Sequence, residues 1–236
     1  MMNKNKIQLN TFSLKLIACL FMLIDHIAMI LIPQSHPAWL IMRMIGRLSA
    51  PIFFYTLSEG LKRTSNRRKY LGRLLVSACI MGAGNGLLGL LGASVIENPP
   101  TILQPNIFLI MFLIGLGIHS LESCKNSGKL KTLLLFIISV ISFSLVIYLP
   151  GYQWLALSSV LSFYIVKQKW ARDLIYILSS LVICLLTQQY VQIFMVLSIL
   201  FITNSSEEKP KHNLKMFFYM FYPMHLWVLY CLSILT

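Results

Sequence analysis

Charged residues are scarce in this sequence of 236 residues. They make up 11% of the chain, whereas 57% of it is apolar and the mean hydropathy is +0.75. A soluble domain carries about 25% charged residues, so these values exclude a water-soluble globule and also a disordered chain. The composition instead predicts an all-α, polytopic membrane helix bundle that forms a single domain over residues 1–236.

Cysteine patterns typical of disulfides or metal sites are also missing. The five cysteines are an odd number, no CxxC pattern occurs, and four of the cysteines lie within apolar runs. We interpret them as small apolar side chains that fill space between helices. The sequence therefore predicts neither a disulfide framework nor a metal site.

Acidic residues are fewer still. Seven aspartates and glutamates stand against 20 lysines and arginines, and the net charge is +13. In a soluble protein such an excess would indicate nucleic-acid binding. Here the basic residues lie in short connections between apolar runs, where they orient a membrane protein and contact anionic lipid. We therefore predict membrane lipid as a partner and no nucleic acid.

The apolar runs predict about nine membrane-spanning helices, within a range of about eight to ten. All lysines and arginines except Arg43 and Arg47 lie in the N-terminal segment, at a run's edge, or in alternate connections between the runs. Positively charged loops stay inside, so the N-terminus is predicted to be cytoplasmic and the protein to lie in a bacterial inner membrane. The runs are about 14–32, 38–61, 74–92, 102–121, 132–149, 152–166, 174–187, 190–203 and 214–235.

Two polar residues, Asp25 and His26, interrupt the middle of the first run, MLIDHIAMIL. Adjacent side chains of a helix point about 100° apart, so both can line one cavity. Histidine is the usual general base near neutral pH, and a nearby carboxylate orients it or stabilises its charged form. The alternative is a core histidine that hydrogen-bonds another helix, but that leaves the buried acid unexplained.

Two arginines and a second histidine extend this polar set. Arg43 and Arg47 lie in the outer half of the second run, where each costs several kcal/mol unless it faces an acid or a cavity. They form either a structural ion pair with Asp25 or part of a working site. His225, in YPMHLWVL, lies at a depth similar to that of His26, which favours a polar cavity shared by the two helices.

Basic residues near the predicted cytoplasmic ends suit an anionic ligand. Lys15 precedes His26 by eleven residues. In a helix this spacing places the two side chains within about 20° of the same face and about 16 Å apart along the axis. A cation at the mouth and a base at depth suit a long anionic ligand, although a lysine at a helix end also snorkels to the interface. The densest basic cluster either contacts anionic lipid or clamps the phosphates of a nucleotide-bearing donor. Its members are Lys62, Arg63, Arg67, Arg68, Lys69 and Arg73.

Four segments of the chain resemble the TraX family, membrane proteins named for the N-terminal acetylation of conjugative pilin. They are LKLIACLFMLIDHIAMIL, MRMIGRLSAPIFFYTLSEGLKRTSNRRKYLGRLL, PNIFLIMFLIGLGIHSLE and FYPMHLWVL. That family is thought to be related to integral-membrane acyltransferases that use acyl-CoA. In that class a basic residue precedes a catalytic histidine by eleven positions, which Lys15 and His26 match. The resemblance implies that Lys15 helps to hold CoA and that His26 is the base.

From these observations we predict an acetyltransferase that takes acetyl-CoA from the cytoplasm and uses no metal. The expected acceptor is an amine or hydroxyl, either the N-terminus of a membrane-embedded pilin or a lipid-linked sugar. In this hypothesis Asp25 orients His26, Arg43 or Arg47 stabilises an oxyanion or anchors the acceptor, and His225 closes the cavity. Asn85 and Asn106 bind the substrate or another helix. The alternatives are a proton-coupled membrane transporter and a non-enzymatic membrane assembly factor.

Overall fold

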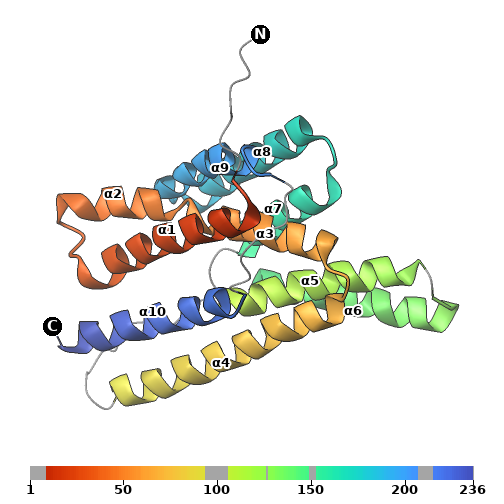
Figure 1. Ribbon diagram of the computed structural model, residues 1–236, viewed down its shortest axis with the longest axis horizontal. Coiled ribbons are helices and arrows are strands. Elements are labelled where there is room, and N and C mark those ends of the chain that lie inside the picture. The colour runs from red at the N-terminus through yellow and green to blue at the C-terminus, as the bar shows by residue number, and fades with distance from the viewer. Residues whose placement is uncertain (1–8, 94–105, 126, 149–152, 207–214, 236) are drawn as a thin grey trace, which may run out of the picture.

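The computed structural model describes residues 9–93, 106–125, 127–148, 153–206 and 215–235, which form a bundle of helices (Figure 1). No strand occurs in these described ranges. Their single β-type pairing is an isolated parallel bridge between Leu9 and Ser205. The helical elements are α1 (Thr11–Leu31), α2 (Pro37–Gly46), α3 (Ser49–Arg63), α4 (Arg67–Ala93), α5 (Ile107–Cys124), α6 (Lys129–Tyr148), α7 (Gln153–Ile165), α8 (Lys169–Thr187), the 3₁₀ helix η2 (Tyr190–Ser198), α9 (Ile199–Thr203) and α10 (Lys215–Leu235).

The helices confirm the predicted polytopic bundle. Seven segments of the described chain are long and apolar enough to cross a membrane, and one of them is the combined stretch Pro37–Arg63. Two shorter apolar segments, Gln153–Ile165 and Tyr190–Thr203, correspond to the sixth and eighth runs of the sequence. These nine segments, the seven long ones and the two shorter ones, follow the order of the predicted spans.

Two of the predicted spans have an internal structure that the apolar pattern did not reveal. The second run is divided into α2 and α3, with Arg47 and Leu48 between them. In a continuous helix the N–H of residue 51 would bond the carbonyl of residue 47, but Pro51 has no N–H and its ring crowds that carbonyl. The eighth run is mostly 3₁₀ helix, completed by the short α9.

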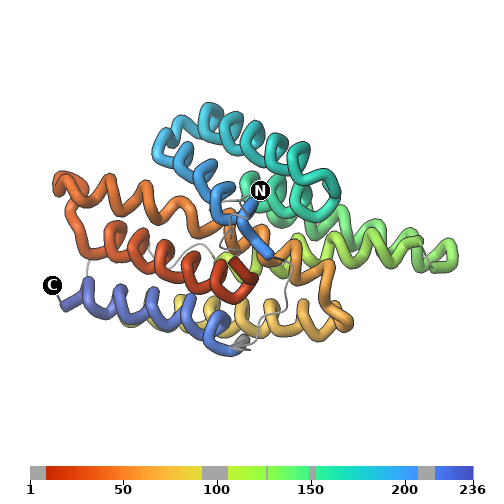
Figure 2. The backbone as a smooth tube through the Cα atoms, turned by 45° about the horizontal axis from the view of Figure 1, so that its top comes forward, coloured from red at the N-terminus to blue at the C-terminus, as the bar shows by residue number. Residues whose placement is uncertain are grey.

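Helix α1 lies at the centre of the arrangement that positions the polar residues. It packs against α2, α3 and α10, so residues from the two ends of the chain lie beside its middle turns. Figures 1 and 2 show α1 between α2 and α10, with α10 in turn beside α4. Large apolar side chains are exposed along α4, α6 and α8. In a helix bundle of this composition, such faces meet lipid.

The connections that we assigned to the cytoplasm meet at one end of the bundle. Lys62 at the end of α3 donates to the carbonyl of Phe163 near the end of α7, over 2.6 Å. Arg67 at the start of α4 donates to the hydroxyl of Tyr164, over 2.9 Å. The N–H of Leu9 donates to the carbonyl of Asn204, over 2.9 Å, which ties the segment before α1 to the end of α9. Among the described residues, the basic ends of α3 and α4 thus lie against the end of α7, as the charge pattern predicts for connections on one side.

Candidate functional site

The histidines in the middle of α1 and α10 contact each other. Nδ1 of His26 on α1 lies 2.8 Å from Nε2 of His225 on α10. Nδ1 of His225 lies 2.7 Å from the carbonyl oxygen of Phe221, one turn earlier in the same helix. The ring of Phe221 stacks on that of His225, with centroids 4.9 Å apart, and Tyr222 meets the His26 ring edge-on. Both residues lie at a similar depth in their runs, as predicted from the sequence, and these contacts hold both imidazoles in place.

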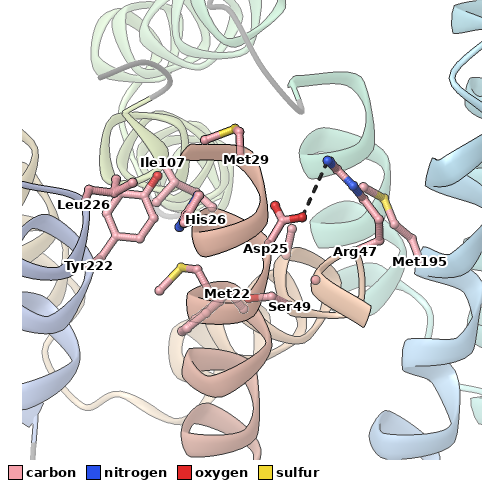
Figure 3. A pocket seen from close by; sticks show the side chains of 13 residues that line it. Met22, Asp25, His26, Met29, Arg47, Ser49, Ile107, Met195, Tyr222 and Leu226 are labelled. Carbon is pink, nitrogen blue, oxygen red and sulfur yellow. Dashed lines mark ion pairs between the residues drawn. The ribbon is translucent and has the colours of Figure 1, made fainter. Parts of the chain in front are cut away.

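Asp25 belongs to a separate ion cluster. Its Oδ1 lies 2.8 Å from Nη1 of Arg43 and 3.7 Å from Nη2 of Arg47, and all three side chains are almost buried. The guanidinium of Arg43 also lies 5.8 Å from the ring centre of Trp39. Figure 3 shows Asp25 and His26 leaving α1 in different directions, Asp25 toward Arg47 and His26 toward Tyr222. The structure therefore has the ion pair that the sequence left as one alternative for the two arginines.

A small cavity of about 90 Å³ lies against His26. Its wall is mostly apolar and draws on α1, α2, α3, α5, η2 and α10 (Figure 3). Asp25 and Arg47 line it together with His26, so the ion cluster and the imidazole border the same space. A mostly apolar wall strengthens the electrostatic interactions of the imidazole.

A second, larger cavity of about 360 Å³ lies toward the end of the bundle that carries the basic connections. Lys15, Arg63 and Arg73 line it, and Glu59 supplies one carboxylate. Phe53 on α3 lines both cavities, so the cation-rich space and the space beside His26 border the same side chain. This arrangement can hold an extended ligand whose anionic end lies among the cations.

The family described as TraX protein matches residues 11–233 of the chain. The chain belongs to the TraX family. A similar curated protein is the probable fimbrial assembly protein FimC, serogroup H1, of Dichelobacter nodosus, which is 27% identical over 240 residues. That match covers 95% of this chain and 96% of the relative. No solved structure matches the chain.

The structure divides the basic residues of this TraX-family protein that we predicted to bind the cofactor. Lys15, Arg63 and Arg73 line the larger cavity. Arg67 instead bonds the carboxylate of Glu122, the hydroxyl of Tyr164 and the carbonyl of Leu61, so it joins α4, α5 and α7. Lys62 donates to the carbonyl of Phe163, and Arg68 lines an open surface hollow beside His119 and Glu122. These three therefore lie outside the wall of the larger cavity.

The two asparagines that we predicted to bind substrate bond other helices of the TraX-family bundle. Oδ1 of Asn85 accepts a hydrogen bond from Nε1 of Trp227, over 3.0 Å, which joins α4 to α10. Asn106 caps the N-terminus of α5 and donates from Nδ2 to the carbonyl of Ala78, over 2.8 Å. Neither asparagine is among the residues that line the two cavities.

Three residues of the site were not singled out from the sequence. Tyr222 lies one turn before His225, a spacing that places both on one helix face, so the YPMH segment carried a usable signal. Phe53, in the PIFF segment, reads as one more core aromatic until its place between the cavities is known. Met195 on η2 is 1% exposed and closes the smaller cavity, and no pattern in the sequence marks it.

Proposed function

We propose that this protein is an integral-membrane acetyltransferase that transfers acetyl from cytoplasmic acetyl-CoA to an acceptor amine or hydroxyl. The single observation that carries the proposal is the pair of cavities that share Phe53, with cations around one and His26 beside the other. Acetyl-CoA has the matching order of groups: phosphates at one end, a long thin arm, and a thioester at the other end.

The larger cavity suits the phosphates. Lys15, Arg63 and Arg73 supply positive charge there, and hydrogen bonds between ionised groups are the strongest kind available to hold phosphate. Oε2 of Glu59 lies 2.7 Å from Nη2 of Arg63. The donor's phosphate replaces this carboxylate as a partner of Arg63, so Glu59 competes with the phosphate for Arg63.

The smaller cavity suits a short acyl group. A water molecule needs roughly 10–15 Å³ of such space, so a cavity of about 90 Å³ has room for a group of the size of an acetyl thioester. This size favours acetyl transfer over the transfer of long acyl groups. The apolar wall also limits the access of water, which would otherwise compete with the acceptor for the thioester.

The chemistry requires one base. His26 takes the proton from the acceptor amine or hydroxyl while the acceptor's nitrogen or oxygen attacks the thioester carbonyl carbon. The carbon–sulfur bond breaks, and the departing CoA thiolate takes the proton back from His26. Arg47 lines the same cavity, and its Nη2 lies 3.7 Å from Oδ1 of Asp25. This position fits a role for Arg47 in stabilising the oxyanion or anchoring the acceptor.

The acceptor that we favour is the N-terminus of a pilin subunit held in the bacterial inner membrane. The support is the name of the similar D. nodosus protein, which links that relative to fimbrial assembly. A lipid-linked sugar offers a hydroxyl at the same depth and is the alternative acceptor. The same name favours a second candidate function, a non-enzymatic assembly factor, which would need neither His26 nor a CoA site.

The test uses the full chain purified in detergent micelles, with acetyl-CoA binding and acetyl-CoA hydrolysis measured side by side. We expect the wild type to bind, Lys15→Ala to bind more weakly, and His26→Ala to bind normally without turnover. His119→Ala is the matched control, because His119 lies on α5 beside the surface hollow and lines neither cavity. A wild type with no affinity for CoA at millimolar concentration would overturn the acetyltransferase and favour the assembly factor.

A further inference from the structure

We infer that His225 is a positioning residue that fixes His26 in the tautomer with a proton on Nδ1 and a lone pair on Nε2. The inference rests on the proposed function, in which His26 is the base. It assigns to an uncharged imidazole on α10 the orienting role that a carboxylate has in a catalytic triad.

The direction of each hydrogen bond follows from the groups at the end of the chain of contacts. The carbonyl oxygen of Phe221 only accepts, so Nδ1 of His225, 2.7 Å away, carries the proton. In a neutral ring the other nitrogen, Nε2, then has a lone pair and accepts. Nε2 of His225 lies 2.8 Å from Nδ1 of His26, so Nδ1 of His26 is the donor. The lone pair of His26 is thereby left on Nε2.

The surroundings hold His225 in this role. Its side chain is 8% exposed, its ring stacks on Phe221, and Tyr222 approaches it edge-on with centroids 5.7 Å apart. A stacked and buried ring cannot turn over to exchange its two nitrogens without breaking the bond to the carbonyl. The lone pair that faces His26 therefore remains in place through the reaction.

Asp25, the obvious carboxylate for the orienting role, is engaged elsewhere. Arg43 and Arg47 both contact its Oδ1, and within the described part of the chain the hydrogen bond recorded for His26 is the one to His225. When His26 takes up the acceptor's proton on Nε2, its Nδ1–H continues to donate to His225. Around the pair, the charged groups that line the cavity are Asp25 and Arg47, and Arg43 contacts the same carboxylate.

Nitrogen NMR of the wild-type protein tests the tautomer directly. The full chain is labelled with ¹⁵N-histidine and studied in detergent micelles, and the His26 signals are assigned by their loss in His26→Gln. We expect a protonated Nδ1 and an unprotonated Nε2 for His26. In His225→Leu, which removes the acceptor, we expect the Nδ1–H form to lose its dominance. A wild-type His26 protonated on Nε2 would overturn the inference without the need for any variant.

Kinetics separate positioning from a structural role. Acetyl-CoA hydrolysis is compared in His225→Leu and His225→Gln, since the amide oxygen of glutamine accepts a hydrogen bond and leucine offers no acceptor. We expect His225→Leu to lower kcat by about 10²–10⁴-fold, the range that a positioned general base contributes. His225→Gln should stay within about tenfold of the wild type, and KM for acetyl-CoA should be unchanged in both variants, because the cations of the larger cavity are untouched.

The two proposals fail in different ways. If the leucine variant hydrolyses acetyl-CoA like the wild type, or if glutamine is as damaging as leucine, His225 does not position the base and the inference is refuted. If the wild type neither binds nor hydrolyses acetyl-CoA, the acetyltransferase is refuted, while the NMR experiment still decides the tautomer of His26.

Discussion

Replacing Gly46 by alanine should disrupt the ion cluster of Asp25, Arg43 and Arg47. Gly46 ends α2 against α1, and a β-carbon added there would lie 2.5 Å from both Cγ and Oδ1 of Asp25. Side chains do not approach so closely, so Asp25 would have to move. It is held by Arg43 at 2.8 Å, and its displacement would lengthen or break that buried ion pair.

The expected cost has two parts. Forcing an extra methyl group into a packed interface costs about 1–3 kcal/mol. Breaking a buried ion pair costs about 3–5 kcal/mol when one charge is left without its partner. The side chains of Arg43 and Asp25 are 15% and 11% exposed, and a second guanidinium, that of Arg47, remains near Asp25. We therefore do not expect the full cost of breaking a buried ion pair. We therefore expect Gly46→Ala to lower the free energy of unfolding by about 2–4 kcal/mol.

Gly86→Ala is the matched control. Gly86 lies within α4, and nothing is found within 4 Å of a β-carbon added there. Alanine is up to about 1 kcal/mol better than glycine in a helix, so this variant should be as stable as the wild type or more so. Equilibrium unfolding in mixed micelles of increasing SDS content measures both variants. Equal stability of the two variants would refute the close contact between α2 and Asp25.

Three further predictions concern the cavities and α5. Lys15→Gln should weaken acetyl-CoA binding about tenfold, which corresponds to about 1.4 kcal/mol, whereas Arg68→Gln should not, because Arg68 lines the separate surface hollow. Isothermal titration calorimetry measures both, and equal losses would count against the larger cavity as the donor site. Asn106→Ala should destabilise the fold by about 1–2 kcal/mol through loss of the α5 cap and should leave the affinity for acetyl-CoA unchanged. A loss of affinity in a variant that remains stable would instead show that Asn106 binds the substrate. Met195→Ala enlarges the smaller cavity and should raise the hydrolysis rate of propionyl-CoA relative to acetyl-CoA about tenfold, in line with ~1–3 kcal/mol for one methylene. An unchanged ratio would mean that the acyl group lies elsewhere.

Much of the fold was accessible from the sequence because membrane spans are local. A helix that crosses lipid satisfies its own backbone hydrogen bonds, so an apolar run is enough to predict it. The division of the second run at Arg47 was missed, although Pro51 carried the signal, because hydropathy averages over a window longer than the break. The 3₁₀ geometry of the eighth run left no comparable mark.

The sequence predicted which residues form the candidate site better than it predicted which of these residues contact each other. Asp25, His26, Arg47 and His225 all stood out because ionisable residues are costly inside an apolar run. The sequence placed Asp25 beside His26 as a partner, since the two are neighbours in the chain. The structure sends Asp25 toward the arginines and His26 toward His225, on a helix 199 residues further along the chain.

The sequence by itself determined which residues lie in the membrane, where the basic connections fall, and which polar side chains need an explanation. These properties depend on composition and on the spacing of residues within one helix. Tertiary structure decided which helix each face of α1 meets, and hence which partner each polar side chain has. Adjacent residues on a helix diverge by about 100°, and no local pattern records which neighbour lies in either direction. Only the packing of α2, α3 and α10 around α1 separates the ion cluster from the histidine pair and makes Phe53 a wall residue of both cavities.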